Sequence, residues 1–197
     1  MIEIMSFGAS TAQGSKDETG GGFIGRIGKN LEDNNLGKSQ NYGIGGETTT
    51  DMVTRLPQLA TIDPNNIVII TLGINDVSRD PDSAPDKRVP LSQHKNNVDQ
   101  ILTHFNARCK TIYASQYPVQ YAQKGLDSKN VTAYVNAGLD LAKKQNVHIV
   151  DIFSMIDTNQ FNTFIHSDGM HFNDEGHAFI AEQLWQYITK NQMIAQS

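Results

Sequence analysis

Ile67-Val68-Ile69-Ile70-Thr71-Leu72 is a continuous run of apolar and β-branched residues in the middle of the 197-residue chain. A run of this kind, without polar residues at alternate positions, is typical of a β-strand that is buried on both faces. It leads directly into Gly73-Ile74-Asn75-Asp76, whose glycine and polar residues indicate a turn at the end of the strand. The stretch therefore predicts an inner strand of a parallel sheet.

Three other segments have the composition of short strands, namely residues 2–7, 111–115 and 147–151, and residues 40–44 indicate the end of a further strand. Apolar residues recur at helical spacing between them, around 23–31, 52–59, 98–105, 131–141 and 179–188, with a shorter helical segment near 153–161. Pro57 falls inside the second of these helices, where we expect the helix to kink or end. The alternation of strands and helices predicts an α/β fold in which helices cover both faces of a five-stranded parallel sheet.

The composition limits the classes of function. A chain of 197 residues with 38% hydrophobic content suits one globular domain. The net charge is −5 and no cluster of lysine or arginine is present, so we expect no nucleic-acid partner. The lone Cys109 excludes an internal disulfide framework. Residues 1–7 contain neither a basic leader nor a long apolar stretch, so we expect no signal peptide, no membrane insertion and a cytoplasmic location.

Polar or glycine-rich segments follow several of the predicted strands. Ser10 follows the first strand, Gly46 the second, Asn75 the third, and a further loop follows Ser115. In an open parallel sheet, ligands bind outside the carboxyl ends of the strands. The sequence therefore predicts that these residues share one edge of the sheet, and that a site is formed there.

Asp168 and His171 are three residues apart, just before the last amphipathic helix. This spacing lets a carboxylate and an imidazole meet at a turn that leads into a helix. The carboxylate would fix the tautomer of the histidine, and His171 is then a candidate general base. Ser10 is the candidate nucleophile, because a serine hydroxyl reacts only when a base accepts its proton.

Four segments together resemble the GDSL esterases, also called SGNH hydrolases after an invariant serine, glycine, asparagine and histidine. The matching segments are Gly8-Ala9-Ser10, Asn41-Tyr42-Gly43-Ile44-Gly45-Gly46-Glu47-Thr48, Gly73-Ile74-Asn75-Asp76 and Asp168-Gly169-Met170-His171. They stand in the family's order and span nearly the whole chain. The family's usual aspartate before the serine is Ala9 here, which changes the support of the first turn.

The resemblance implies a single domain over residues 1–197 with a three-layer fold and a flavodoxin-like sheet. It also implies Ser10 as nucleophile, His171 as base and Asp168 as the acid that orients the base. The implied oxyanion hole consists of the N–H groups of Ser10 and Gly46 and the side-chain amide of Asn75. The expected activity is cleavage of small carboxylic esters through an acyl-serine intermediate, without a cofactor. Sugar deacetylation, lysophospholipid hydrolysis and thioester cleavage all occur in the family, and neither the substrate nor the oligomeric state follows from the sequence.

The acyl group of the substrate is expected to be short. Two polar excursions, residues 77–90 and about 119–129, remain to build an acyl pocket after the strands and helices are assigned. The first is rich in charged residues and the second contains few apolar ones, so neither predicts a long apolar tunnel.

Structural roles are the first alternative for the same residues. Ser10 and Asp168 are each able to cap a helix, although Asp174 is better placed to cap the last helix. Asp76 is expected to be a turn former. His177 is expected to lie on a helix face near the edge of the site.

Other functional classes remain open from the residues alone. Histidine and carboxylate side chains would bind zinc, but their spacing matches no zinc signature. The side chains concerned are His166, Asp168, His171, Asp174 and His177. The segment from Ser10 to Ser15 is similar to the phosphate-binding loop of flavodoxins, which favours a flavin-binding protein, but leaves Asn75 unexplained. A non-catalytic carbohydrate-binding or interaction domain is the third alternative.

Overall fold

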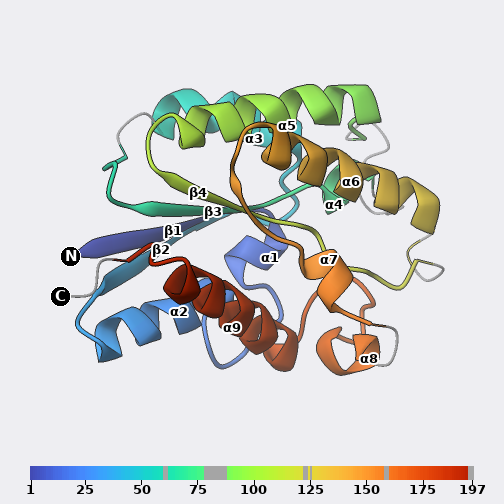
Figure 1. The fold of residues 1–197 in the computed structure, drawn as a ribbon. Helices are drawn as coiled ribbons and strands as arrows, with labels where there is room; N and C mark the ends of the chain where they lie inside the picture. The colour runs from blue at the N-terminus through green and yellow to red at the C-terminus, as the bar shows by residue number, and fades with distance from the viewer. Residues whose placement is uncertain (60–61, 78–87, 122–123, 125, 158–159, 195–197) are drawn as a thin grey trace.

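A parallel five-stranded sheet forms the middle layer of the protein in a computed structural model (Figure 1). The structure describes residues 1–59, 62–77, 88–121, 124, 126–157 and 160–194. The strands are β1 (Ile2–Gly8), β2 (Gly37–Gly43), β3 (Ile67–Thr71), β4 (Lys110–Ala114) and β5 (His148–Val150). Their order is β2-β1-β3-β4-β5, and every pair of neighbours is parallel. The predicted flavodoxin-like α/β fold is confirmed.

The two faces of β3 contact two separate apolar layers. Ile67 and Ile69 are fully buried against the layer that contains α2 and α9, whereas Val68 and Ile70 are buried against the layer that contains α3 and α5. Successive side chains of a strand point to opposite faces. The uninterrupted apolar run is therefore explained by burial on both sides.

Helices cover both faces of this sheet. One face carries α2 (Gly22–Asp33) and α9 (Asp174–Lys190), and the other carries α3 (Thr49–Arg55), α5 (Leu91–Asn106) and α6 (Ser128–Lys144) (Figure 1). Three short helices follow the ends of β1, β3 and β5, namely α1 (Ser10–Gln13), α4 (Ile74–Val77) and α7 (Ile152–Met155). A fourth short helix, α8 (Phe161–Phe164), lies between α7 and α9. Long helices thus form the layers, and three of the short ones lie where strands end.

Two boundaries add to the sequence prediction or confirm it. The second strand, of which the sequence indicated only the end, begins at Gly37 and pairs with β1 in register over seven positions. The helix α3 ends at Arg55, which confirms the expected end near Pro57, and the segment Leu56–Leu59 is a 3₁₀ helix. The excursion at 77–90 lies largely outside the described residues.

The cap of the last helix was predicted wrongly. Asn173, and not Asp174, is the N-cap of α9, and its side chain accepts the N–H of Gly176 at 2.9 Å. Asp174 is the first helical residue, and its carboxylate instead accepts the N–H of Glu18 at 2.9 Å and the hydroxyl of Thr19 at 2.9 Å.

Of the helices that the structure describes, none combines the length and the apolar character required to cross a membrane.

Candidate active site

The ends of β1 and β3 bring two of the predicted site segments together. The two strands are direct neighbours, and Gly8 is in register with Thr71. Gly8 has a φ of 149°, and a Cβ there would collide with the carbonyl oxygen of Thr71. Glycine therefore allows the chain to turn away from the sheet at this point, and Ser10 and Asn75 leave the same edge from adjacent strands.

Ser10 is the first residue of α1 and is largely buried. The carbonyl oxygen of Ser10 accepts the N–H groups of Gly14 at 3.0 Å and Ser15 at 2.9 Å, so its backbone is part of a closed turn. N–H groups in the first turn of a helix have no partner within the helix. The Ser10 N–H therefore has no acceptor within the helix. An oxyanion donor requires such an N–H.

Gly46 lies in a tight turn after β2. The N–H of Glu47 donates to the carbonyl oxygen of Ile44 at 3.1 Å, and Gly46 has a φ of 76° at the third position of this turn. A positive φ at that position is the conformation of a type II turn, which glycine adopts without strain. A Cβ on Gly46 would have no atom within 4 Å. The Gly46 backbone therefore faces open space at this edge.

Asn75 belongs to α4, directly after β3. Its Nδ2 donates one hydrogen bond to the carbonyl oxygen of Glu47, at 2.9 Å. An amide nitrogen carries two hydrogens, so this bond orients the amide and leaves its second N–H for another acceptor. The Gly46 turn and the Asn75 side chain are thereby joined.

Asp168 and His171 form the contact that their spacing predicts. His171 Nδ1 lies 2.8 Å from Asp168 Oδ2, and Asp168 Oδ1 accepts the N–H groups of Met170 at 2.8 Å and His171 at 3.0 Å. Partial burial alone would raise the pKa of Asp168, but the hydrogen bonds from His171 and Met170 outweigh it and hold this pKa well below its ordinary value. Asp168 is therefore an ionised carboxylate throughout the neutral range, and it does not cap α9.

Ser10 and His171 lie on segments that are joined through Tyr117. The hydroxyl of Thr11, next to Ser10, donates to the Tyr117 hydroxyl at 2.9 Å. The Tyr117 ring packs on Phe172, next to His171, with 3.9 Å between the ring centroids. Among the hydrogen bonds of the described residues, none links the Ser10 and His171 side chains directly. Catalytic hydrogen bonds are often loose in the absence of substrate.

The segment after Ser10 is also bound to the helix that follows His171. His177 is fully buried in α9, and its Nε2 lies 3.1 Å from the carbonyl oxygen of Ser15. The carboxylate of Asp174 is bonded to residues 18 and 19 of the same segment. His177 is thus a buried anchor, whereas the sequence indicated an ordinary helix-face position.

Burial makes His177 sensitive to acid, which gives a testable pH dependence. Desolvation lowers the pKa of His177 below its ordinary value of 6.5, with the bond to Ser15 opposing the shift. Below about pH 6.5 the unfolded chain binds a proton at this residue that the folded chain does not bind, so stability falls as the pH falls towards the folded-state pKa. We expect the Tm of the wild type to fall more between pH 7 and pH 5 than that of His177→Gln, whose amide is still able to donate to Ser15. An equal fall in Tm for the wild type and His177→Gln would show that His177 is not the source of this pH dependence.

The residues considered for a metal site form two separate groups. Asp174 and His177 are engaged with residues 15–19. His166 Nδ1 and His171 Nδ1 lie 3.2 Å and 2.8 Å from Asp168 Oδ2. Across the described residues, no three side chains of histidine, cysteine, aspartate or glutamate are grouped so that they could hold a metal ion.

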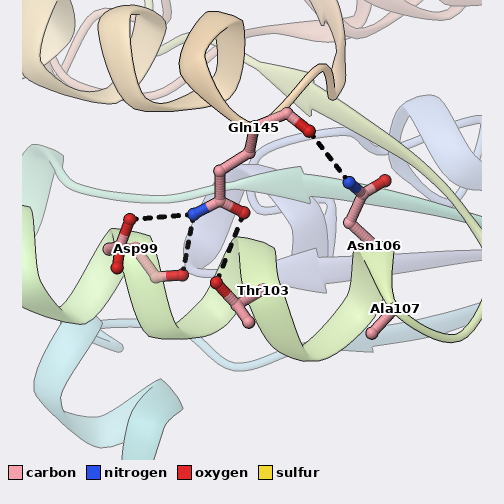
Figure 2. Close-up of a pocket in the computed structure, with 5 residues that line it drawn as sticks. All are labelled: Asp99, Thr103, Asn106, Ala107 and Gln145. Atoms are coloured by element: carbon pink, nitrogen blue, oxygen red, sulfur yellow. Dashed lines mark hydrogen bonds between the residues drawn. The ribbon is translucent and has the colours of Figure 1, made fainter.

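A polar groove of about 430 Å³ lies elsewhere, at the opposite edge of the sheet (Figure 2). Its lining comes from the last turns of α5 and the end of α6, which lead directly into the starts of β4 and β5. The side chains are already bonded to one another: Gln145 Nε2 donates to Asp99 Oδ1 at 2.9 Å and Thr103 Oγ1 donates to Gln145 Oε1 at 3.4 Å. The groove lies between the ends of α5 and α6 and is separate from the edge that carries Ser10.

Two polar features of the edge were missed by the sequence analysis. Asp76 is fully buried in a hydrogen-bond network with His94, although a turn former was expected there. His94 is four residues before Val98 on the buried side of α5, so its helical spacing was a signal for burial. Tyr117 carried no signal of its own.

The comparison with protein families gives the class of the protein, the carboxylic ester hydrolases of α/β architecture. The sequence pattern of the GDSL-like Lipase/Acylhydrolase family matches residues 6–179, and the chain belongs to this family. The resemblance found in the sequence is thereby confirmed, and the flavodoxin alternative is not supported.

Individual relatives agree with the family. The chain is 25% identical over 170 residues to the human isoamyl acetate-hydrolyzing esterase 1 homolog, with 76% of this chain and 68% of the relative covered. Among solved structures, a lipase/acylhydrolase from Enterococcus faecalis has a TM-score of 0.79 at 19% identity, with 97% of both chains covered. An acetyl xylan esterase from Geobacillus stearothermophilus has a TM-score of 0.79 at 19% identity, with 94% of both chains covered. The two structures show the same fold.

Proposed function

We propose that the protein hydrolyses small esters of short acyl groups through an acyl-Ser10 intermediate. The observation that carries the proposal is the Asp168–His171 hydrogen bond at 2.8 Å on a segment that packs, through Tyr117, against the segment of Ser10. This arrangement supplies a nucleophile, a base and an acid that orients the base.

The proposed reaction has two steps. Asp168 accepts a hydrogen bond from Nδ1–H of His171, which leaves Nε2 as the proton acceptor for the Ser10 hydroxyl. Ser10 Oγ attacks the ester carbonyl, and the alcohol leaves with the proton carried by His171. Water then attacks the acyl-enzyme, with His171 again as base, and releases the carboxylic acid.

Three donors would stabilise the negative charge that forms on the carbonyl oxygen in each step. They are the N–H groups of Ser10 and Gly46 and the free N–H of the Asn75 amide. Such donors act because they are already oriented when the charge develops. The turn at Gly46 and the bond from Asn75 to Glu47 supply this orientation.

Replacement of Asn75 tests the oxyanion hole. We expect Asn75→Ala to lower kcat by about 10²–10³-fold, the usual loss for one such donor, with a much smaller change in KM. Steady-state kinetics on a single ester measures both constants. An Asn75→Ala enzyme with normal kcat would show that Asn75 only holds the Glu47 turn.

The length of the acyl group is the second specific expectation. The names of the human relative and of the bacterial structural neighbour refer to acetyl esters, which supports a deacetylase or a related short-chain esterase. Each buried methylene is worth about 0.8 kcal/mol, or roughly fourfold in kcat/KM, so a long-chain lipase gains steeply along an ester series. We expect a maximum between acetyl and butyryl p-nitrophenyl esters.

The same ester panel, run on wild type and Ser10→Ala, tests the proposed function. A continued rise in kcat/KM into long chains would favour lysophospholipid hydrolysis, and a preference for thioesters would favour a thioesterase. EDTA is included in a parallel series. Activity that is lost to the chelator and restored by zinc would indicate a metal-dependent hydrolase instead.

A further inference from the structure

A second aspartate–histidine pair is buried next to Asn75. His94 Nδ1 lies 2.6 Å from Asp76 Oδ2, and neither side chain is exposed to solvent. Removal of two ionisable groups from water costs free energy that an apolar pair of the same size would not cost. The reaction described above makes no use of this pair, so its retention beside the proposed oxyanion hole requires a separate explanation.

Asp76 binds the beginning of α3 with both carboxylate oxygens. The N–H of Thr49 donates to Asp76 Oδ1 at 2.9 Å, and the Thr49 hydroxyl donates to Asp76 Oδ2 at 2.6 Å. Asn97, on α5, donates to the Thr49 hydroxyl at 3.0 Å. The first residue of α3 is therefore fixed to α4 and to α5 at once.

The two segments joined in this way carry two of the proposed oxyanion donors. Asn75 directly precedes Asp76, and Gly46 lies three residues before Thr49. The bond from Asn75 Nδ2 to the Glu47 carbonyl oxygen adds to the two bonds between Asp76 and Thr49. Three hydrogen bonds thus hold residues 47–49 against residues 75–76.

The His94 imidazole makes one hydrogen bond in the described part of the chain, and it is the one to Asp76. Its Nε2 is buried without a hydrogen-bond partner among the described residues. The ring packs against Tyr134, with 4.9 Å between the centroids, and a Cβ on Gly73 would lie 2.9 Å from its Cε1. Because the imidazole is packed on two sides, it has a fixed position, and its bond holds the Asp76 carboxylate in one orientation.

We propose that Asp76 and His94 are positioning residues for the oxyanion hole, which set the distance between the Gly46 N–H and the Asn75 amide. The proposal rests on the esterase function proposed above. Oxyanion donors work only when they point at the position where charge develops, and a displacement of about 1 Å is able to cost about 10²-fold in rate. Loss of the His94–Asp76 bond should therefore lower kcat without weakening substrate binding.

Two substitutions at His94 separate positioning from packing. His94→Asn keeps a donor at the place of Nδ1 but leaves unfilled volume, whereas His94→Leu fills more of the volume but has no donor. We expect His94→Leu to lower kcat by about 10- to 100-fold with KM changed less than about threefold, and His94→Asn to retain most of kcat. A packing role predicts the reverse order. If the leucine variant does not fold, Thr49→Val removes one donor to Asp76 at nearly constant volume, and the same loss of kcat is expected.

A double-mutant cycle with Asn75→Ala identifies the step on which the pair acts. Once the Asn75 amide is absent, His94→Leu should lower kcat by clearly less than it does in the wild type, because coupled residues are not additive. His104→Asn, near the other end of α5 and half-buried, is the matched control and should leave kcat unchanged. If His94→Leu lowers kcat equally in the wild type and in Asn75→Ala, or does not lower kcat at all, the positioning role is overturned, but the proposed esterase function is not. A wild type without esterase activity would overturn the proposed function, and this inference with it.

Discussion

Ser10→Ala should lose at least about 10⁴-fold in kcat, because the proposed acyl intermediate cannot form without the hydroxyl. The substitution should leave the fold intact. The Ser10 side chain makes no hydrogen bond with another described residue, and the closed turn around it depends on its backbone carbonyl. The measurement is kcat on an acetyl ester together with Tm, and the Tm should change by no more than a few degrees.

Covalent labelling gives the direct version of this test. Treatment of the wild type with a fluorophosphonate should add one phosphonyl group at Ser10, located by mass spectrometry of the peptides. Ser15→Ala, in the same segment, is the matched control and should still be labelled and active. A label on any other residue would reject Ser10 as the nucleophile.

Asp168→Asn should lower kcat by about 10³- to 10⁴-fold through the tautomer of His171. Asp168 Oδ1 already accepts two backbone N–H groups, so the amide oxygen of asparagine would take that place. The amide nitrogen would then face His171 Nδ1 and donate to it. The proton of the neutral imidazole would move to Nε2, where it blocks acceptance of the Ser10 proton.

A remote carboxylate provides the control for this substitution. Asp127 caps α6 and accepts the N–H of Lys129 at 2.8 Å, so Asp127→Asn removes a comparable charge without effect on kcat. The pH profile adds a second check, because the lowered pKa of Asp168 keeps it ionised. The acid limb of kcat/KM in the wild type should therefore follow one ionisation. A normal kcat in Asp168→Asn would show that its carboxylate is not needed to orient His171.

The sequence was most informative where one physical demand governs a whole segment. Burial on both faces gave β3 an uninterrupted apolar run, and helical spacing marked the long helices. The spacing of Asp168 and His171 was sufficient to predict their contact, since both lie in one local turn. The sequence indicated only the end of the second strand, because Gly37 to Ser39 pair with β1 but carry no apolar signal.

Contacts between distant polar residues were not predictable in this way. Asp76 and His94 are 18 positions apart, and Thr11 and Tyr117 are 106 apart. Such pairs meet only because the strands bring their loops to one edge of the sheet. Neither the periodicity of apolar residues nor the spacing of nearby residues predicts these contacts. The cap of α9 was misassigned for a local reason, because Asn173, one residue before Asp174, takes that role. The partners of Asp174 in residues 18–19 lie far away in sequence and were not predictable.

The long separation between Ser10 and His171 also has a consequence for protein synthesis. The strand that precedes Ser10 is made first, yet it lies between β2 and β3, and its loop is held by His177 of the last helix. A nascent chain on the ribosome therefore lacks part of the site until α9 has left the exit tunnel and packed against α2. Since domains generally fold as units, the onset of ester hydrolysis during translation would report completion of the entire fold.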